Sequence, residues 1–468
     1  MKAYAKLGQA MLDELAAVLG AENVLTDAET LDHYKTDEET DPKKFHLPEA
    51  VVKPGSAAEV AAVVKLCNKY NVPVTVRGGG TSLADGAIPV CGGIVLLIER
   101  LNKILEMNTE GMYMVVEAGV RTIDIQKTAN EAGFLYAGDP CSAESCLIGG
   151  NLATNAGGNK AVRYGVTRNQ VYSMEIVTPT GEIVEIGGRL KKCSTGYCME
   201  QLVMGSEGTL GIITKATLKL LPLPPYKLDL LAVFDDPAKA LEMVPMIAKA
   251  GINPTSIEYM DNSYVRGTSE YIEFKNPPHY EDGIYVIVTV ETFNEEELDM
   301  KMEQLSDLCD EAGAVDVLEA DERIWAMRRN CQESVRLISL ISLTDDVVVP
   351  VDKIADTIKY IMKIGEKYPF PVPAKINAHI GDGNLHIVLC KGELSDEEWE
   401  ENVHAFHEEV YKYAYEQGGR LAGEHGIGAK KIGYMEEFTP AVELELMRKI
   451  KLAWDPNLIL NPGKLFNC

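Results

Sequence analysis

The apolar positions of the chain fall into two kinds of run. Short runs rich in β-branched residues, at residues 72–76, 94–98 and 114–118, predict buried strands. The run at residues 59–67 has helical spacing, and Ser56 stands where a helix N-cap is expected. Strands and helices therefore alternate in the first part of the chain, which predicts an α/β or α+β layout.

Residues 221–225 (LPLPP) form the clearest boundary, because three prolines in four positions favour an extended connector. Beyond it, strands are predicted at residues 228–234 and 284–292, and helices at residues 237–250 and 295–312. The same kinds of element recur in this second part, so we expect a second α+β domain.

A long helix is predicted from Ser395 to about Gln417. Acidic residues fill its first turn, Ser395 serves as N-cap, and Gly418 follows its end. His404 and His407 lie three residues apart on this helix, and glutamates surround both of them. We therefore expect the two histidines to lie on a solvated face rather than to bind a metal.

Composition narrows the classes of protein. A chain of 468 residues exceeds one hydrophobic core, and its net charge of −26 argues against binding nucleic acid or an anionic membrane. No apolar run approaches the roughly 18 residues of a membrane span. Asp13 and Glu14 stand where a signal peptide would be apolar, and the 10 cysteines form no C-x-x-C pair. We expect a cytoplasmic protein without an iron–sulfur cluster of its own.

The sequence VRGGGTSLADG at residues 76–86 predicts a ligand-binding loop. Its glycines follow a predicted strand directly, so backbone N–H groups can converge on a phosphate, and Thr81 and Ser82 add hydroxyl donors. A glycine-rich turn without a ligand is the alternative. No helix with G-x-G-x-x-G spacing follows, which disfavours NAD. We interpret the loop as a site for the pyrophosphate of another dinucleotide.

Residues 148–159 (IGGNLATNAGGN) are almost all small or amide residues. Such a run lets the backbone lie flat against a planar ligand, with Asn and Thr side chains for polar contacts; a flexible linker is the alternative. Residues 175–185 predict a hairpin, and residues 204–214 predict a second glycine-rich turn that runs into a strand.

Two histidines, His379 and His386, flank the sequence IGDGNL. If residues 381–384 form a four-residue turn, His379 pairs with His386 and both imidazoles share one face, close enough to share a metal. Glu424 and His425 lie in a further glycine-rich segment. Two histidines and a carboxylate suit Zn²⁺, Fe²⁺ or Mn²⁺, and His425 could then act as a general base. Two structural histidines on a hairpin are the alternative.

Arg328 is the best candidate for binding a substrate anion. A guanidinium grips a carboxylate through two parallel hydrogen bonds. A surface ion pair with the nearby Asp321 or Glu322 is the alternative, and it is the commoner fate of an arginine.

Together these motifs resemble the flavoprotein 2-hydroxy-acid dehydrogenases of the vanillyl-alcohol oxidase type, whose FAD-binding domain is of the p-cresol methylhydroxylase (PCMH) type. This group includes D-lactate dehydrogenases, the flavin subunit of glycolate oxidase and D-2-hydroxyglutarate dehydrogenase. The similarity runs from about Pro48 to Phe466. It rests on residues 77–82, 148–151, 155–158, 205–211, 379–386, 424–426 and 461–464.

The resemblance implies an α+β fold in three parts. These are a PCMH-type FAD-binding domain of two α+β subdomains (residues 1–224), an α+β substrate or cap domain with an antiparallel sheet (residues 225–417), and a C-terminal segment that returns to the FAD domain (residues 418–468). FAD is expected to bind noncovalently, because no His or Cys lies at residues 77–86. The residues implied in cofactor binding are Arg77, Gly78, Gly79, Gly80, Thr81, Ser82, Gly86, Asp139, Pro140, Ile148, Gly149, Asn151, Thr154, Asn155, Gly158, Gly208, Ile212, Ile213, Glu424 and Asn461.

The resemblance also implies the roles of the polar residues. Positions matching His379, His386 and Glu424 hold a divalent metal (Fe²⁺, Zn²⁺ or Mn²⁺) in such enzymes. The position of His425 carries the base that takes the hydroxyl proton, and that of Arg328 holds the substrate carboxylate.

The expected substrate is a small 2-hydroxy acid. Gln332 and Thr344 stand where 2-hydroxyglutarate enzymes have Thr and Lys, so a monocarboxylate is favoured, most simply D-lactate oxidised to pyruvate. The chain shows no second redox centre, so its electrons must pass to a partner. We expect an electron-transferring flavoprotein, with NAD or ferredoxin reached through it. An iron–sulfur subunit, as in glycolate oxidase, is the second choice, and direct reaction with O₂ is the third.

Two alternatives belong to other classes of protein. One is a catalytically silent subunit with an FAD-binding fold, which is disfavoured because His379, His386, Glu424 and His425 are all present. The other is a metal-dependent hydrolase that uses the histidines without a flavin. A D-2-hydroxyglutarate dehydrogenase stays open within the favoured class.

Overall fold

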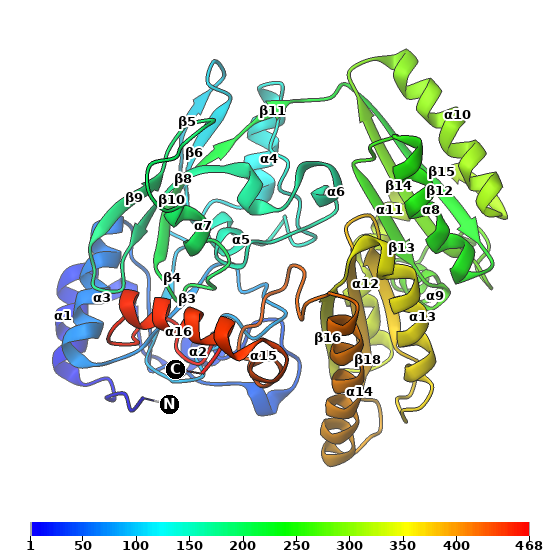
Figure 1. Ribbon diagram of the computed structural model, residues 1–468. Helices are drawn as coiled ribbons and strands as arrows, with labels where there is room; N and C mark the ends of the chain where they lie inside the picture. The colour runs from blue at the N-terminus through cyan, green and yellow to red at the C-terminus, as the bar shows by residue number, and fades with distance from the viewer. Residues whose placement is uncertain (1, 468) are drawn as a thin grey trace. The chain divides into compact units, whose positions relative to one another are not determined.

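The computed structural model describes residues 2–467 and divides into two compact units (Figure 1). The first unit contains the residues up to Gly157, Val166–Leu223 and the residues from Glu424 onward; the second contains Gly158–Gly165 and Pro224–Gly423. One boundary thus falls inside the proline-rich connector. Residues 158–165, which the sequence analysis assigned to the FAD-binding domain, belong to the second unit.

The first unit is built on two main sheets. One sheet has the strand order β1-β2-β4-β3, in which β2 and β3 run parallel to β4. The other has the order β5-β6-β10-β8-β9 and is antiparallel throughout. Their strands are β1 (Val24–Leu25), β2 (Ala50–Val52), β3 (Val74–Arg77), β4 (Ile94–Leu97), β5 (Ile104–Asn108), β6 (Tyr113–Glu117), β8 (Val171–Val177), β9 (Ile183–Gly187) and β10 (Ile212–Lys219), and β7 (Phe134–Leu135) pairs separately with β11 (Leu221–Pro222).

The helices of the first unit cover these sheets with apolar faces. α3 begins at Ser56, whose hydroxyl accepts the N–H of Glu59, as the sequence predicts. Met11 of α1 and Val64 of α3 are fully buried in one core. The bounds are α1 (Gln9–Leu19), α2 (Ala28–His33), α3 (Ala57–Tyr70), α4 (Thr122–Glu131), α5 (Ile148–Thr154), α7 (Met199–Val203), α15 (Ile432–Phe438) and α16 (Ala441–Trp454).

The first part of the glycine-rich run, residues 148–154, forms a helix, α5, and not the flat backbone expected from its composition. Ile148 and Leu152 are fully buried, and Asn155 ends the helix in the left-handed conformation at φ 55°. A Cβ on Gly149 would lie 2.8 Å from Cδ1 of Ile98. Glycine therefore serves close packing here, and packing overrides its poor intrinsic helix propensity.

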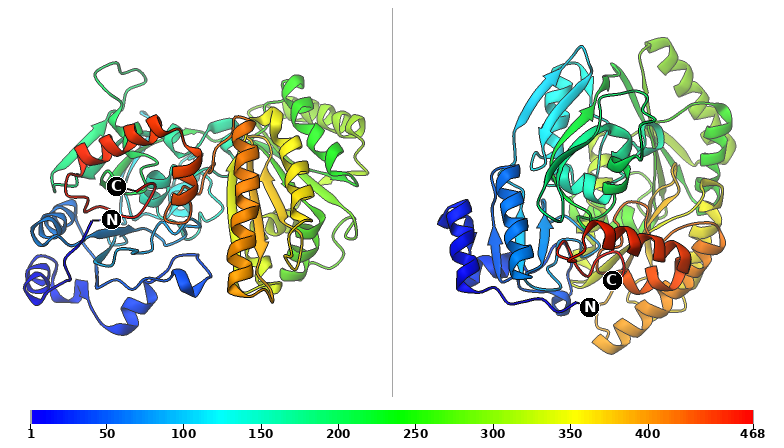
Figure 2. Two further views of the ribbon diagram at one scale, coloured as in Figure 1. Left: turned by 60° about the horizontal axis from the view of Figure 1, so that its bottom comes forward. Right: turned by 60° about the vertical axis from the view of Figure 1, so that its left-hand side comes forward.

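The C-terminal segment returns to the first unit and joins its sheet. Val74 of β3 exchanges backbone hydrogen bonds with Ile459 and Asn461 (2.9 and 2.7 Å). The other end of the chain lies close by, because the Tyr4 hydroxyl donates to the carbonyl of Leu458 (2.5 Å; Figure 2). This pairing places Leu460 beside Val74, the first residue of β3.

The second unit is built on a seven-stranded antiparallel sheet of order β15-β12-β14-β13-β17-β18-β16. The strands are β12 (Tyr226–Phe234), β13 (Ser256–Met260), β14 (Ile284–Thr292), β15 (Asp316–Glu319), β16 (Ser342–Val348), β17 (Lys375–His379) and β18 (Asn384–Cys390). Residues 284–292 match the predicted strand. The near-continuous burial of β14, β17 and β18 reflects helices on both faces of this sheet.

One face of this sheet carries α8, α10, α13 and α14, and the other carries α9, α11 and α12 (Figure 1). The helices predicted at residues 237–250 and 295–312 are confirmed. Ser395 and Glu398 form a capping box at the start of α14, within the predicted helix. The bounds are α6 (Ala161–Tyr164), α8 (Pro237–Ala250), α9 (Asn262–Tyr271), α10 (Glu295–Ala312), α11 (Glu322–Arg329), α12 (Cys331–Ser334), α13 (Ile354–Gly365) and α14 (Asp396–Glu416). Across residues 2–467, no helix combines the length and the apolar character needed to cross a bilayer.

Candidate active site

The glycine loop after β3 lines a cavity of about 220 Å³ in the first unit. Many residues predicted to bind the cofactor form its wall: Gly78, Gly79, Gly80, Thr81, Ser82, Gly86, Pro140, Gly149, Asn151, Thr154, Gly208, Ile213, Glu424 and Asn461. Other predicted residues do not line it, namely Arg77, Asp139, Ile148, Asn155, Gly158 and Ile212. The structure therefore brings together residues from five motifs that lie far apart in sequence, at residues 77–82, 148–151, 205–211, 424–426 and 461–464.

The glycines of the loop are required by close packing. A Cβ on Gly79 would collide with the carbonyl oxygen of Ser145, and Gly80 has φ 74°. Arg77 is turned away from the cavity: its Nη1 donates to the carbonyl of Thr36 (2.6 Å), and its guanidinium lies over the ring of Tyr34. Arg77 thus stabilises the loop from the side away from the cavity, and the backbone of the glycines faces the cavity, where it can bind a ligand.

Buried charges support the far end of this loop. Asp85 is 4% exposed at φ 60°, and its Oδ1 makes no hydrogen bond to any residue from 2 to 467. Burial raises the pKa of Asp85 to about 7, and Lys430 opposes this rise. Lys430 also donates to the carbonyl of Leu83 (2.7 Å). The conformation of the loop is therefore linked to a titratable group near neutral pH.

Asn461 offers an unused acceptor beside the cavity. Its Nδ2 donates to the carbonyl of Glu207 (2.6 Å), while its buried Oδ1 has no hydrogen-bond partner within the described chain. A buried acceptor of this kind is usually satisfied by a ligand or a water. The glycine-lined wall and this acceptor fit a dinucleotide that carries hydroxyl and ring N–H donors.

Sequence reasoning missed several residues of the wall. Apolar and thiol side chains contribute to it, among them Leu83, Ile98, Cys141 and Cys146. Glu207 also lines the cavity. Burial raises the pKa of its carboxyl, although hydrogen bonds from the N–H groups of Ile427 and Gly428 act to lower it. The sequence offered one signal for Glu207, which is its position between Ser206 and Gly208 in a predicted glycine-rich turn.

In the second unit, the histidine hairpin has a different register from the one predicted. His379 pairs with Asn384 and His386 pairs with Asn377, so the predicted pairing of the two histidines is wrong. The turn comprises residues 380–383, because Asn384 already belongs to β18. Its side-chain Nδ2 donates to Asp346 and to the carbonyl of Val347, both on the neighbouring strand β16.

The two imidazoles nevertheless share one face of the sheet. In this register they are diagonal neighbours, since each histidine lies two residues from the direct partner of the other. Their ring centroids are 5.2 Å apart, with the ring planes at 88°. Both rings are buried, His379 at 1% and His386 at 7% exposure. The site can therefore offer two imidazoles from rigid strands.

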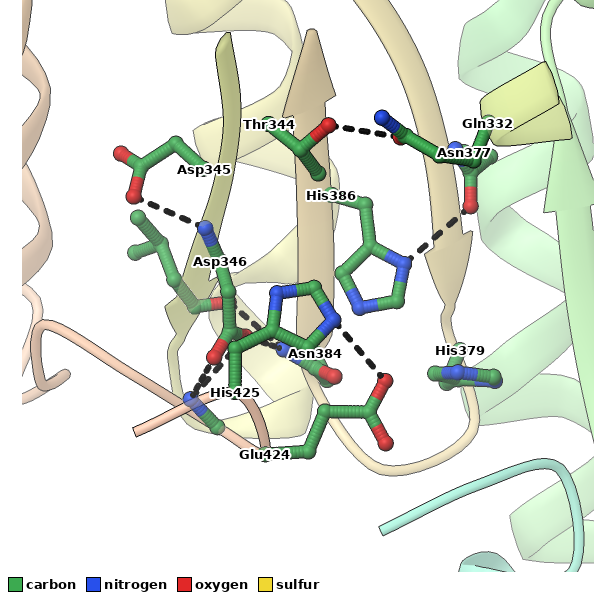
Figure 3. Close-up of polar contacts among 12 residues, drawn as sticks. Gln332, Thr344, Asp345, Asp346, Asn377, His379, Asn384, His386, Glu424 and His425 are labelled. Carbon is green, nitrogen blue, oxygen red and sulfur yellow. Dashed lines mark hydrogen bonds and ion pairs between the residues drawn. The ribbon is translucent and has the colours of Figure 1, made fainter. Parts of the chain in front are cut away.

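An oxygen acceptor lies beside Nδ1 of each ring, and Nη2 of Arg328 also lies 3.5 Å from Nδ1 of His379. Nδ1 of His379 lies 2.8 Å from Oε1 of Glu258, and Nδ1 of His386 lies 3.2 Å from Oδ1 of Asn377 (Figure 3 shows the second pair). When Nδ1 donates to these oxygens, Nε2 carries the lone pair on each ring. This arrangement is typical of metal-binding histidines, whose other nitrogen is held by a carboxylate or an amide.

Arg328 is not on the surface but buried in an ion pair with Glu258. Its Nε and Nη2 lie 2.9 and 2.7 Å from Oε2 of Glu258, with 3% and 0% of the two side chains exposed. Burial would raise the pKa of Glu258, but His379 and Arg328 together hold it below its usual value. Arg328 thus borders the histidine pair, and its predicted role as a carboxylate anchor stays a prediction.

Glu424 and His425 follow directly after Gly423, the last residue of the second unit. The Gly423 N–H donates to both carboxylate oxygens of Asp346 (3.0 and 2.9 Å), whose Cα is paired with that of His386. Within the first unit, Nε2 of His425 lies 3.6 Å from Oε1 of Glu424 (Figure 3). Gly423 is therefore tied to Asp346 of β16, and the two residues that follow it along the chain are a carboxylate and an imidazole.

Two further predictions concern the surroundings of the hairpin. His404 is exposed at 61%, but His407 is buried at 4%, so the expectation that His407 faces solvent is wrong. Its Nε2 lies 3.5 Å from Oδ2 of Asp345, because α14 rests on β16 at this point. Thr344, also on β16, donates to the side-chain oxygen of Gln332 (2.6 Å; Figure 3).

The chain belongs to the FAD-linked oxidases. It matches the family described as FAD linked oxidases, C-terminal domain, over residues 223–465, and the FAD binding domain family over residues 48–187. D-lactate dehydrogenase of Anaerostipes hadrus is 39% identical over 427 residues, 89% of each chain. Glycolate oxidase subunit GlcD of Bacillus subtilis is 34% identical over 430 residues, 91% of this chain and 90% of the relative.

A further relative is the D-2-hydroxyglutarate dehydrogenase of Stutzerimonas stutzeri, 32% identical over 465 residues, 98% of this chain and 99% of the relative. Among solved structures, p-cresol methylhydroxylase superposes with a TM-score of 0.79 at 18% identity, covering 97% of this chain and 96% of that one. The fold is therefore the predicted α+β architecture of the PCMH type. The protein is an FAD-linked oxidoreductase of the D-lactate, glycolate and D-2-hydroxyglutarate dehydrogenase type.

Proposed function

We propose that this protein oxidises a small 2-hydroxy monocarboxylate to the 2-oxo acid, with D-lactate as the first candidate substrate. The observation that carries the proposal is the histidine pair. Nδ1 of each ring is held by Glu258 or Asn377, so both Nε2 atoms are prepared as ligands on one sheet face. This feature suits a metal-assisted reaction of a hydroxy acid better than it suits a silent subunit.

The donor set fits a divalent metal such as Zn²⁺, Fe²⁺ or Mn²⁺. His379 and His386 would supply two nitrogen ligands. Glu424 would supply a carboxylate, since Gly423, the residue before it, is held by Asp346. When bound, the metal would polarise the 2-hydroxyl group of the substrate and lower its pKa.

The remaining steps fall to named side chains. Arg328 would hold the substrate carboxylate, and its pairing with Glu258 keeps the guanidinium in a fixed orientation. His425, which lines the cofactor cavity, would accept the hydroxyl proton. FAD, when bound, would supply the acceptor for the hydride from carbon 2. With the hydroxyl proton, the substrate then loses two electrons and two protons in all as it becomes a 2-oxo acid.

A monocarboxylate is preferred because of the pair formed by Gln332 and Thr344. Both side chains are neutral and they bond to each other, so they offer no second cation for a dicarboxylate. The electrons would leave through a partner, an electron-transferring flavoprotein in our proposal, because the sequence contains no motif for a second redox centre. A glycolate oxidase type of assembly with an iron–sulfur subunit is the second candidate, and GlcD relatives at 34% identity favour it.

An anaerobic visible spectrum of the purified protein tests the proposal. Flavin bands should be present, and D-lactate should bleach them faster than L-lactate, glycolate or D-2-hydroxyglutarate does. His425→Asn should retain the bands and lose the bleaching, while His404→Asn, at an exposed site on α14, should behave like the wild type. A protein without flavin bands, or unchanged bleaching in His425→Asn, would refute the assignment.

The electron route needs a separate measurement. Reduced protein should be reoxidised rapidly by an electron-transferring flavoprotein and slowly by O₂. Copurification with an iron–sulfur protein, together with no reaction with the flavoprotein, would replace our first choice by the glycolate oxidase type.

A further inference from the structure

Glu207 lies in the second glycine-rich turn, and its carboxylate is directed at the loop that carries His425. Oε1 accepts the N–H of Ile427 and Oε2 accepts the N–H of Gly428, both at 2.7 Å. These two residues follow His425 at two and three positions. Each carboxylate oxygen therefore fixes one peptide group of that loop, through hydrogen bonds of the stronger, charge-assisted kind when the group is ionised.

The contact between Glu207 and this loop is close and buried. A Cβ on Gly426 would lie 2.6 Å from Oε1 of Glu207, and Gly426 has φ 85°. Glu207 itself is 7% exposed. A buried carboxylate seated on a glycine next to His425 leaves that segment little freedom to shift, because any movement would break two hydrogen bonds inside the protein.

The backbone of Glu207 is tied to the cofactor cavity. Its N–H donates to the carbonyl of Ala153 in α5 (2.7 Å), and its carbonyl accepts from Nδ2 of Asn461 (2.6 Å). Ala153, Asn461 and Glu207 all line the cavity, as does His425. Glu207 thus connects the glycine helix, the C-terminal segment and the His425 loop within the first unit.

We propose that Glu207 is a positioning residue that holds His425 at a fixed place on the wall of the cofactor cavity. Its carboxylate does so by binding the peptide groups of Ile427 and Gly428, while its backbone is anchored to α5. The role of His425 as a base rests on the proposed function above. The clamp on the loop is a property of the first unit and can be measured without any substrate.

The first test is hydrogen exchange of the wild-type protein and of Glu207→Gln, each without substrate. In the wild type the amides of Ile427 and Gly428 should exchange at least about tenfold more slowly than unprotected amides, with or without added FAD. In Glu207→Gln only one side-chain oxygen remains, so one of these amides should lose its protection. Unprotected exchange in the wild type would overturn the proposal even if the variant failed to fold.

The second test separates positioning from general stability. Glu207→Gln should still fold and bind FAD, with a Tm lowered by a few degrees because one buried amide loses its acceptor. Reduction of its flavin at saturating D-lactate should nevertheless be about tenfold slower or more, with little change in KM. Glu200→Gln, in the same segment on α7, is the matched control and should change neither quantity. Wild-type exchange and reduction rates in Glu207→Gln would refute the role.

The two tests fail separately. If no hydroxy acid bleaches the wild-type flavin, the proposed function is wrong, but the exchange result still decides whether the clamp exists. If the wild type is active and the Ile427 and Gly428 amides are protected, unchanged flavin reduction in Glu207→Gln overturns the positioning role alone.

Discussion

Glu258 gives the sharpest prediction, because one buried carboxylate serves both an arginine and a predicted metal ligand. It accepts from Nε and Nη2 of Arg328 on one oxygen and lies 2.8 Å from Nδ1 of His379 on the other. Glu258→Gln keeps the shape of the side chain but replaces one acceptor oxygen by an NH₂ donor. The amide can therefore accept a hydrogen bond from only one of the two partners.

Both orientations of the amide are unfavourable. With its oxygen on Arg328, the NH₂ faces Nδ1 of His379, which must then accept; the ring proton moves to Nε2 and removes the lone pair needed for a metal. With its oxygen on His379, the NH₂ opposes the guanidinium. In either case the buried Arg328 loses its counter-charge, which costs about 3–5 kcal/mol of unfolding free energy.

The assay combines thermal unfolding with metal binding. For a unit of about 200 residues, this loss corresponds to a fall in Tm of roughly 6–20 °C. Metal affinity should fall about 10–100-fold, as is usual when the group behind a ligating histidine is removed. Glu319→Gln, at an exposed position of β15 in the same sheet, should change neither quantity. A Tm within 2 °C of the wild type, or unchanged metal affinity, would refute the reasoning.

Three further results are expected. Gly79→Ala should lower the Tm of the cofactor-free protein, at a cost of about 1–3 kcal/mol, because its Cβ meets the Ser145 carbonyl; Gly78→Ala, whose nearest atoms are at 3.7 Å, should not. Burial raises the pKa of Asp85 to about 7, so its contribution to stability is present below about pH 4 and is lost as the pH rises to about 7. The free energy of unfolding of Asp85→Asn, measured in urea, should therefore rise relative to that of the wild type between pH 4 and 8, by at most about 4 kcal/mol. A difference between the two proteins that stays constant with pH would contradict this. Chelation of the metal should stop bleaching by D-lactate and keep the flavin bands; full bleaching after metal removal would count against the metal site.

The sequence alone determined a good part of the regular elements of this protein. Helices such as α8 and α10 and the strand β14 follow the predicted ranges, because the period of apolar positions and the capping residues act over a few neighbouring positions. The glycine loop and the two histidines were also visible as motifs. Their chemistry depends on residue types that stand close together in the chain, so it could be recognised without coordinates.

Only the tertiary structure decided how the motifs are combined. The hairpin register depends on Asp346 from another strand, which holds Asn384 and moves the turn by one residue. His407 is buried because α14 rests on β16, and no local pattern distinguishes it from His404.

The same holds for the buried partners of the candidate site. Glu258 stands 121 residues before His379, and Glu207 stands 220 residues before Ile427, so nothing in the nearby sequence marks either glutamate as a partner. Hydrogen bonds across such separations arise only when the sheets and loops are assembled. The sequence named the groups that can react, and the folded chain selected the buried carboxylates that orient them.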